Sequence, residues 1–277
     1  MDAKALVTAG RLSEARQQLT EELKAAPADL AKRTTLFQVL AFLGEWDKAE
    51  RHLDAIAAQN QKAETGVQVY RNLVQAEKER SAVRALSCRP SFLPHASLYA
   101  ESHFAACEKL IEKDFEQAHA LFDQLDTQRL NVAGTFNGKD FAGIFDTDAF
   151  LRCFLETIVQ ERYVWIPFEA IEELSLAKPK TLFDLIWAPA RVVTWQGLAL
   201  SCYIPVLYPD SSKNPDDRVK LGRMTDWVDL GEGFFRGAGQ HVFQIGDEEV
   251  ALLEIRELLF VKPHGIGEKV GADETAD

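Results

Sequence analysis

Hydrophobic residues recur at helical spacing through the first 126 residues of the chain. Two clear runs are Leu36, Leu40, Leu43 and Ala49, Leu53, Ile56. Spacing of three or four residues places apolar side chains on one face of an α-helix. The pattern predicts helices over residues 30–43, 47–58 and 64–86, an extended crossing at the prolines of 87–94, and further helix over 97–126.

Part of this helical region repeats with a period of 34 residues. Four positions match at that offset: Gly10 with Gly44, Leu12 with Trp46, Ala15 with Ala49, and Leu19 with Leu53. This is the period of the tetratricopeptide helix–turn–helix unit. A degenerate third copy starts at Phe115, with Ala118 and Phe122 at the matching spacing. The repeat predicts a tetratricopeptide-like array of helical hairpins. The alternative is a generic helical bundle in which the similarity between the two segments arose by chance.

After residue 126 the helical period weakens, and glycines and short apolar runs take over. Asp146 and Asp148 predict the cap of a helix that runs to about Gln160, and Pro167 predicts a short helix over 168–176. Strands are expected at 163–166, 181–187, 191–196, 198–204, 226–230, 241–245 and 250–260, with a glycine-rich connection between 230 and 241.

These patterns together predict an α+β protein with two domains. We expect a tetratricopeptide-like helical domain at residues 1–126, a linker at 127–133, and a small domain of mostly antiparallel strands at 134–261. The remaining residues, 262–277, are rich in Gly, Glu, Lys, Ala and Asp and predict a disordered acidic tail.

Charge and composition then narrow the function classes. The chain has 31 Lys and Arg against 43 Asp and Glu, a formal net charge of −12. This disfavours binding of nucleic acid or anionic lipid, which both rely on Lys and Arg. No signal sequence or long apolar run is evident, and the four cysteines are widely spaced, as in reduced proteins. A cytoplasmic protein without a nucleic-acid or membrane partner is expected.

Two pairs of residues carry chemistry in principle. Asp146 and Asp148 could hold a divalent metal, but acidic residues are also favoured at a helix start. His103 and Cys107 lie four apart and could bind zinc, which needs two further ligands. We therefore predict no catalytic residue, no metal and no cofactor. The enzyme alternative is a metal-dependent, hydrolase-like protein that uses Asp146, Asp148 and His241.

A binding surface is the more natural expectation for a helical array, because such arrays bind extended peptides or helices along their inner face. By the phase of the repeat, the inner face of the second unit contains Gln38, Ala41, Glu45 and Lys48. The alternative is that these side chains are only solvated.

Several motifs of the second half are similar to those of the ImpE family, also called TagJ or SciE. They are Tyr-Val-Trp-Ile-Pro-Phe at 163–168, Asp-Leu-Ile-Trp-Ala-Pro-Ala at 184–190, Leu-Gly-Arg-Met-Thr-Asp-Trp at 221–227 and Gly-Ala-Gly-Gln at 237–240. Their order matches the family, which also has a helical-repeat N-terminus. Phe168 and Phe183 depart from the family pattern, where tryptophan and arginine are expected. The resemblance covers nearly the whole chain except the acidic tail.

The resemblance implies a non-enzymatic accessory component of the bacterial type VI secretion system. Such a protein is expected to bind the sheath small subunit (TssB/VipA type) and to link the sheath to the ClpV ATPase. Acidic rims of its binding groove would select a basic partner. Arg223, Asp226 and Trp227 would form a contact patch if exposed, or a buried Arg–Asp pair beside the tryptophan. An effector chaperone of the same system is the other function left open.

Overall fold

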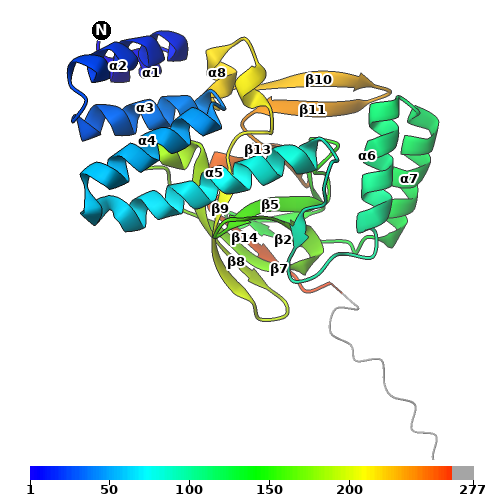
Figure 1. The fold of residues 1–277 in the computed structure, drawn as a ribbon. Coiled ribbons are helices and arrows are strands. Elements are labelled where there is room, and N and C mark those ends of the chain that lie inside the picture. Colours follow the sequence, from blue (N-terminus) through cyan, green and yellow to red (C-terminus); the bar gives the residue numbers. More distant parts are fainter. Residues whose placement is uncertain (264–277) are drawn as a thin grey trace, which may run out of the picture.

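The computed structural model describes residues 1–263, a helical part followed by a β-structure (Figure 1). The helices are α1 (Ala3–Thr8), α2 (Leu12–Ala25), α3 (Leu30–Phe42), α4 (Trp46–Gln59), α5 (Glu64–Arg84), α6 (Ala100–Glu112), α7 (Phe115–Gln128) and the short α8 (Asp217–Lys220). The predicted acidic tail lies, from residue 264 onward, outside the described residues.

The second part is built from short strands, most of them antiparallel to their neighbours. They are β1 (Ser91–Phe92), β2 (Ala133–Phe136), β3 (Lys139–Ala142), β4 (Ile144–Asp146), β5 (Phe154–Val159), β6 (Arg162–Pro167), β7 (Ile171–Leu176), β8 (Trp187–Thr194), β9 (Ala199–Pro205), β10 (Thr225–Gly231), β11 (Phe234–Gly239), β12 (Val242–Ile245), β13 (Glu248–Ala251) and β14 (Glu257–Phe260). The predicted α+β class with mostly antiparallel strands is confirmed.

The strands of the described residues form one large sheet and two small ones. The large sheet has the order β1-β6-β5-β9-β8-β7-β14-β2-β3, the second has the order β13-β12-β4, and β10 and β11 form a hairpin. The pairing of β1 with β6 is parallel. Because β1 precedes α6 and α7 in the chain, residues before the expected linker also contribute to the sheet.

The matched positions of the repeat mark equivalent helix starts. The helices α2, α4 and α7 all have 14 residues and begin at the matched positions Leu12, Trp46 and Phe115. Two residues earlier the backbone has a positive φ in each case: Gly10 (72°), Gly44 (65°) and Lys113 (61°). Glycine adopts this conformation without steric cost, which explains why two of the three copies carry it.

Two hydrophobic clusters in the described residues each contain side chains of both the helical and the β part. Tyr70 of α5 stacks on Phe183 with ring centroids 4.1 Å apart, and Phe37 of α3 lies 5.3 Å from the same ring. Trp46 approaches Trp187 at 6.1 Å. Large aromatic side chains dominate core energetics, so α3, α4 and α5 are held against the sheet by apolar burial.

The helix predicted from Asp146 to about Gln160 is wrong. Residues Phe154–Val159 instead form β5, which lies inside the large sheet between β6 and β9. A strand buried on both faces has a continuous apolar run, and this run also satisfies helical spacing. Asp148 caps only a turn, because it accepts a hydrogen bond from the Phe150 amide at 2.8 Å.

Other element predictions need smaller corrections. Of the helix predicted over 168–176, only Phe168–Ala170 is helical, and of the strand predicted over 181–187 only Trp187 is in a strand. The glycine-rich connection contains a whole strand, β11, and the strand expected over 250–260 is split between β13 and β14. Pairing with distant strands decides these segments, and local pattern does not encode it.

Candidate functional site

A cleft of about 510 Å³ lies between α2, α3 and α4. Its floor is apolar and consists of Leu23, Leu36 and Leu40, all buried. Its rim is basic and consists of Arg16, Lys24, Arg33, Lys48, Arg51 and His52, with Glu45 as the acidic member. We call this the helical cleft. Because apolar floor and charged rim coexist, it has the make-up of a peptide-binding groove.

The electrostatics of the helical cleft are positive. Glu45 forms ion pairs with both Arg16 and Lys48. His52 is half-buried, and its pKa is lowered by that burial and then by the charges of Arg33 and Arg51. The expectation of an acidic rim is therefore wrong for this cleft, since its lining holds five Lys or Arg residues and one Glu.

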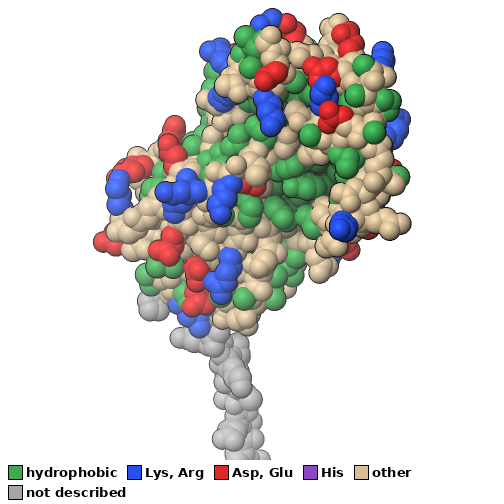
Figure 2. Space-filling model, turned by 90° about the vertical axis from the view of Figure 1, so that its left-hand side faces the viewer, with side chains coloured by type: hydrophobic (Ala, Val, Ile, Leu, Met, Phe, Trp, Pro, Cys, Tyr) green, Lys and Arg blue, Asp and Glu red, His purple; other side chains and the backbone are tan. Residues whose placement is uncertain are grey.

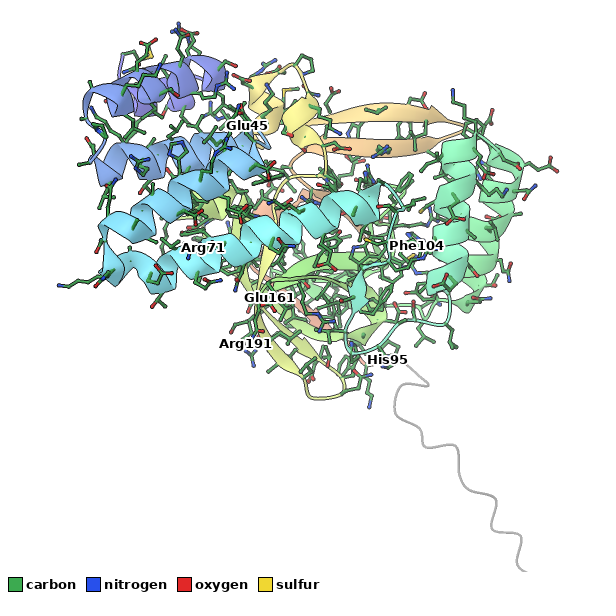
Figure 3. All side chains as sticks on the ribbon, viewed as in Figure 1. Glu45, Arg71, His95, Phe104, Glu161 and Arg191 are labelled. Carbon is green, nitrogen blue, oxygen red and sulfur yellow. The ribbon has the colours of Figure 1, made fainter. Side chains whose placement is uncertain are left out.

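The four predicted inner-face residues are divided between different surroundings. Glu45 and Lys48 line the helical cleft. Ala41 is buried and lines a second cleft, whereas Gln38 is half-buried and lines neither. In Figure 3, Glu45 lies at the end of the hairpins next to α8. Sequence reasoning missed the cations of α2 and the floor of the cleft, although the spacing of four between Leu36 and Leu40 marks one helix face.

The second cleft, of about 470 Å³, lies where the helical part meets the loop that follows β9. Trp46, Ile111 and Ile186 give it apolar walls, and Arg80 and Arg84 of α5 lie at its base among other charged residues. The arginines belong to a group of buried charges beneath the cleft, which we call the buried network. Its members are Glu77, Arg80, Arg84, Asp146, Asp148, Glu156 and His241.

The buried network joins α5 to the strands through charge-assisted hydrogen bonds. Arg80 donates to Glu156 through Nε at 2.8 Å and to the Leu207 carbonyl at 2.6 Å. His241 lies between two carboxylates, with Nδ1 2.8 Å from Asp146 and Nε2 2.7 Å from Glu156. Each of these charges thus has an opposite charge in contact, the condition under which buried ions are tolerated.

The pairing fixes the protonation states. Burial alone lowers the pKa of His241, but Asp146 and Glu156 outweigh it and raise the pKa to about 9. Burial raises the pKa of Glu156, but the charges of Arg80 and His241 outweigh that and lower it to about 2. The imidazolium and the carboxylate are therefore both charged at neutral pH.

The residues of the enzyme hypothesis all lie in this network. Asp146 and His241 are in contact, but Asp148 accepts from both terminal nitrogens of Arg84 at 3.0 and 3.1 Å. Asp146, Asp148 and His241 are each at most 2% exposed. Their polar atoms are engaged by protein partners, so this arrangement serves to hold helix and strands together.

The zinc candidates are in contact with each other inside the protein. Cys107 Sγ lies 3.7 Å from His103 Nε2, which donates a hydrogen bond to the Phe150 carbonyl at 2.9 Å. Burial lowers the pKa of His103 to about 4, so the ring is neutral at pH 7. Within residues 1–263, no group of three or more His, Cys, Asp or Glu side chains is arranged to hold a metal ion.

The motif residues Arg223, Asp226 and Trp227 are exposed, so the buried Arg–Asp pair is wrong. Arg223 donates to the carbonyls of Thr8 and Val7 at the end of α1, at 2.8 and 3.0 Å. Asp226 accepts from the Asn214 amide at 2.9 Å. Arg223 and Asp226 therefore have separate partners.

The β10–β11 hairpin and the residue before it expose large apolar side chains that the sequence reasoning only partly found. These side chains are Met224, Trp227, Val228 and Phe235. The ring of Trp227 lies 5.8 Å from that of Tyr208, and its strand partner is Gly237. Successive side chains of a strand point to opposite faces, so Trp227 lies on one face of the hairpin and Val228 on the other. Exposed apolar residues at both positions show that both faces of the hairpin are open to solvent here.

Charge elsewhere on the surface is mixed. Figure 2 shows Lys, Arg, Asp and Glu side chains interspersed over one face of the molecule, together with a hollow in which hydrophobic side chains gather. Among the described residues, no helix has the length and apolar character needed to cross a membrane.

Fold and surfaces define an α+β protein in which helical hairpins are fused to an antiparallel sheet. The ImpE protein family matches residues 138–259. A protein of Pseudomonas aeruginosa named type VI secretion system accessory component TagJ is 32% identical over 271 residues, which cover 94% of this chain and 91% of that protein. The chain therefore belongs to the family of ImpE and TagJ.

A solved crystal structure of a Vibrio parahaemolyticus protein has the same fold. It superposes with a TM-score of 0.84 at 21% identity and covers 94% of this chain and 97% of the other. Because both chains are covered almost completely, the two structures share the helical hairpins as well as the sheet.

Proposed function

We propose that this protein is a non-enzymatic adaptor of the type VI secretion system that works in the cytoplasm. It binds the sheath small subunit (TssB/VipA type) and links the sheath to the ClpV disassembly ATPase. The observation that carries the proposal is the 32% identity, over 94% of the chain, with the accessory component TagJ. Similarity over this length extends across both the hairpins and the β-structure.

The surfaces support an adaptor because a linking protein needs two contact regions. The first is the helical cleft, with Glu45 and Lys48 at its rim, on hairpins that we regard as a tetratricopeptide-like array. Ala41 and Gln38 lie on the preceding helix, α3, outside the cleft. The second is the β10–β11 hairpin with the residues just before it, where Arg223, Asp226 and Trp227 are exposed and further apolar side chains are exposed as well. We assign the first region to the sheath subunit and the second to the ATPase.

The proposal is tested by calorimetric titration of the purified protein with the sheath small subunit from the same genome. Saturable binding is expected, and the adaptor–sheath complex is then expected to retain ClpV on a size-exclusion column. Trp227→Ala should weaken ClpV retention and leave sheath binding unchanged. Leu259→Ala is a matched control, since Leu259 is exposed to a similar degree on another strand.

A folded protein that gives no heat with the sheath subunit would contradict the proposal. The effector proteins of the same system would then be the partners to titrate, as an effector chaperone requires. Retention of ClpV without the adaptor would contradict the linking role alone.

A further inference from the structure

We infer that the helical cleft binds an amphipathic helix that carries acidic residues beside its apolar stripe. The inference deepens the proposed function, on which it rests, by naming the chemistry of the segment that docks. It reverses the expectation that an acidic protein selects a basic partner.

The charge of the cleft is opposite to the charge of the chain. The whole chain has 31 Lys and Arg against 43 Asp and Glu, whereas the lining of the cleft has five Lys or Arg against one Glu. Complementary charge selects partners and speeds encounter, and like charge excludes wrong partners. A partner with basic flanks would meet five like charges at this rim.

Part of the basic rim is free to take up acidic side chains. Within the described part of the chain, Lys24 and Arg51 form no ion pair, and both are exposed. Arg33 donates to the Pro27 carbonyl at 2.6 Å, a neutral partner. An incoming carboxylate can therefore pair with Lys24 or Arg51 without breaking an existing ion pair.

The floor and walls of the cleft favour a helix as the occupant. The three leucines of the floor come from α2 and α3, and the rest of the lining comes from these helices, from α4 and from the turn at Glu45. No strand edge meets the cleft among these lining residues. An extended peptide would lose water from backbone groups without gaining partners, whereas a helix satisfies its own. Apolar residues at i, i+3, i+4 and i+7 of that helix would contact the leucines.

Two synthetic peptides test the inference by fluorescence anisotropy. They share one leucine stripe at helical spacing, and one has glutamate flanks where the other has lysine flanks. We expect the glutamate peptide to bind at least about tenfold more tightly, with affinity that falls as salt is raised. Equal binding of the two peptides, or tighter binding of the lysine peptide, would overturn the inference.

Charge-reversal variants locate the site. The double variant K24E/R51E should weaken binding of the glutamate peptide about tenfold or more. The matched control K139E/K178E changes the net charge by the same amount at exposed lysines outside the cleft and should leave the affinity unchanged. Because Lys24 and Arg51 are exposed, both variants are expected to fold, and circular dichroism checks this. An equal loss in both variants would mean that net charge alone matters, which overturns the inference.

Titration with the sheath subunit separates this inference from the proposed function. If the subunit binds wild type and K24E/R51E equally, the adaptor proposal stands and the helical cleft is not its acidic-helix site. If the glutamate peptide binds the cleft and the sheath subunit does not bind at all, the cleft inference stands and the adaptor proposal fails.

Discussion

The helical cleft and the buried network are both built from charged side chains, but they are organised in opposite ways. In the network, Arg80 and Glu156 are 4% and 3% exposed, and each contacts an opposite charge. At the cleft, Lys24 and Arg51 are exposed and have no ion pair among the described residues. Buried pairs are costly to break, whereas exposed charges contribute little to stability.

The difference separates stability from recognition. The partners in the network are far apart in the chain: Arg80 pairs with Glu156, and Glu77 accepts from the indole of Trp187 at 2.9 Å. These contacts fasten α5 to the sheet. The cleft instead has the cationic side chains of Lys24 and Arg51 above an apolar floor, and an acidic partner can pair with these cations. Three substitution experiments compare these two regions, and a fourth compares two repeat turns.

The largest effect is expected for Arg80→Met. The change leaves Glu77 and Glu156 buried with one less positive charge, and loss of one member of a buried pair costs about 3–5 kcal/mol of unfolding free energy. Arg71→Met is the matched control on the same helix, because Arg71 pairs with the exposed Asp54 and Glu64. It should cost less than about 1 kcal/mol. Urea denaturation measures both, and similar losses would contradict a special role for the network.

The next effect is a pH dependence of stability with two limbs. The pKa of His241 is raised from 6.5 to about 9, so its stabilisation is complete below pH 6.5 and is lost as the pH rises toward 9. The pKa of Glu156 is lowered from 4.5 to about 2, so its stabilisation is complete above pH 4.5 and is lost as the pH falls toward 2. Each limb is expected to reach about 2–3 kcal/mol. Unfolding free energy should therefore be highest between pH 4.5 and 6.5.

Two histidine variants assign the alkaline limb. His241→Gln should abolish the fall in stability between pH 6.5 and 9, because the titrating group is gone. His95→Gln, at an exposed histidine, should retain it. A limb that persists in His241→Gln would show that another group titrates there.

A smaller effect distinguishes the two equivalent repeat turns. Gly10 and Gly44 both have positive φ. A Cβ added at Gly44 would lie 2.5 Å from Ser212 Oγ, whereas a Cβ added at Gly10 would lie 3.9 Å from its nearest neighbour, Arg223 Nη1. Gly10→Ala should cost about 1–2 kcal/mol from backbone strain alone, and Gly44→Ala about 1 kcal/mol more. Ser212→Gly in the Gly44→Ala background should recover the difference. Equal melting temperatures for the two single variants would show that the loop at Ser212 yields freely.

The same glycines show how far the sequence predicts the fold. The repeat marks the helix starts at Leu12, Trp46 and Phe115, because a turn and its following helix are specified locally. Helical spacing alone predicts a start at 47 and one continuous helix over 97–126, where the structure has α6 and α7. The segment 154–159 was not, because a strand with apolar residues on both faces has the pattern of a helix. This segment is a strand because it pairs with β6 and β9. Both strands lie later in the chain, and the local pattern of residues 154–159 does not record the pairing.

The residues of the candidate sites also differ in how well the sequence predicts their positions. Repeat phase predicts Glu45 and Lys48 on the inner face of the second unit, and both residues line the helical cleft. It predicts Ala41 and Gln38 on the same face, but the packing of α3 against its neighbours leaves both residues outside that cleft. The basic rim was not predictable from a net charge of −12, since net charge does not say where opposite charges gather. His241 and Glu156 meet only through sheet topology, 85 positions apart in sequence.

The smallest effect on stability is expected at the rim of the helical cleft. Arg51→Gln should change the unfolding free energy by less than about 0.5 kcal/mol, because Arg51 is exposed and forms no ion pair among the residues described. It should nevertheless raise the pKa of His52, which the charge of Arg51 lowers, as measured by NMR titration. Arg162→Gln, at an exposed arginine outside the cleft, should leave that pKa unchanged. A pKa shift without a stability loss would show that the rim charge acts on its surroundings and contributes nothing to folding. A large loss of unfolding free energy would instead mean that Arg51 stabilises the fold, as the charges of the buried network do. The assignment of the cleft rim as a recognition surface would then be contradicted.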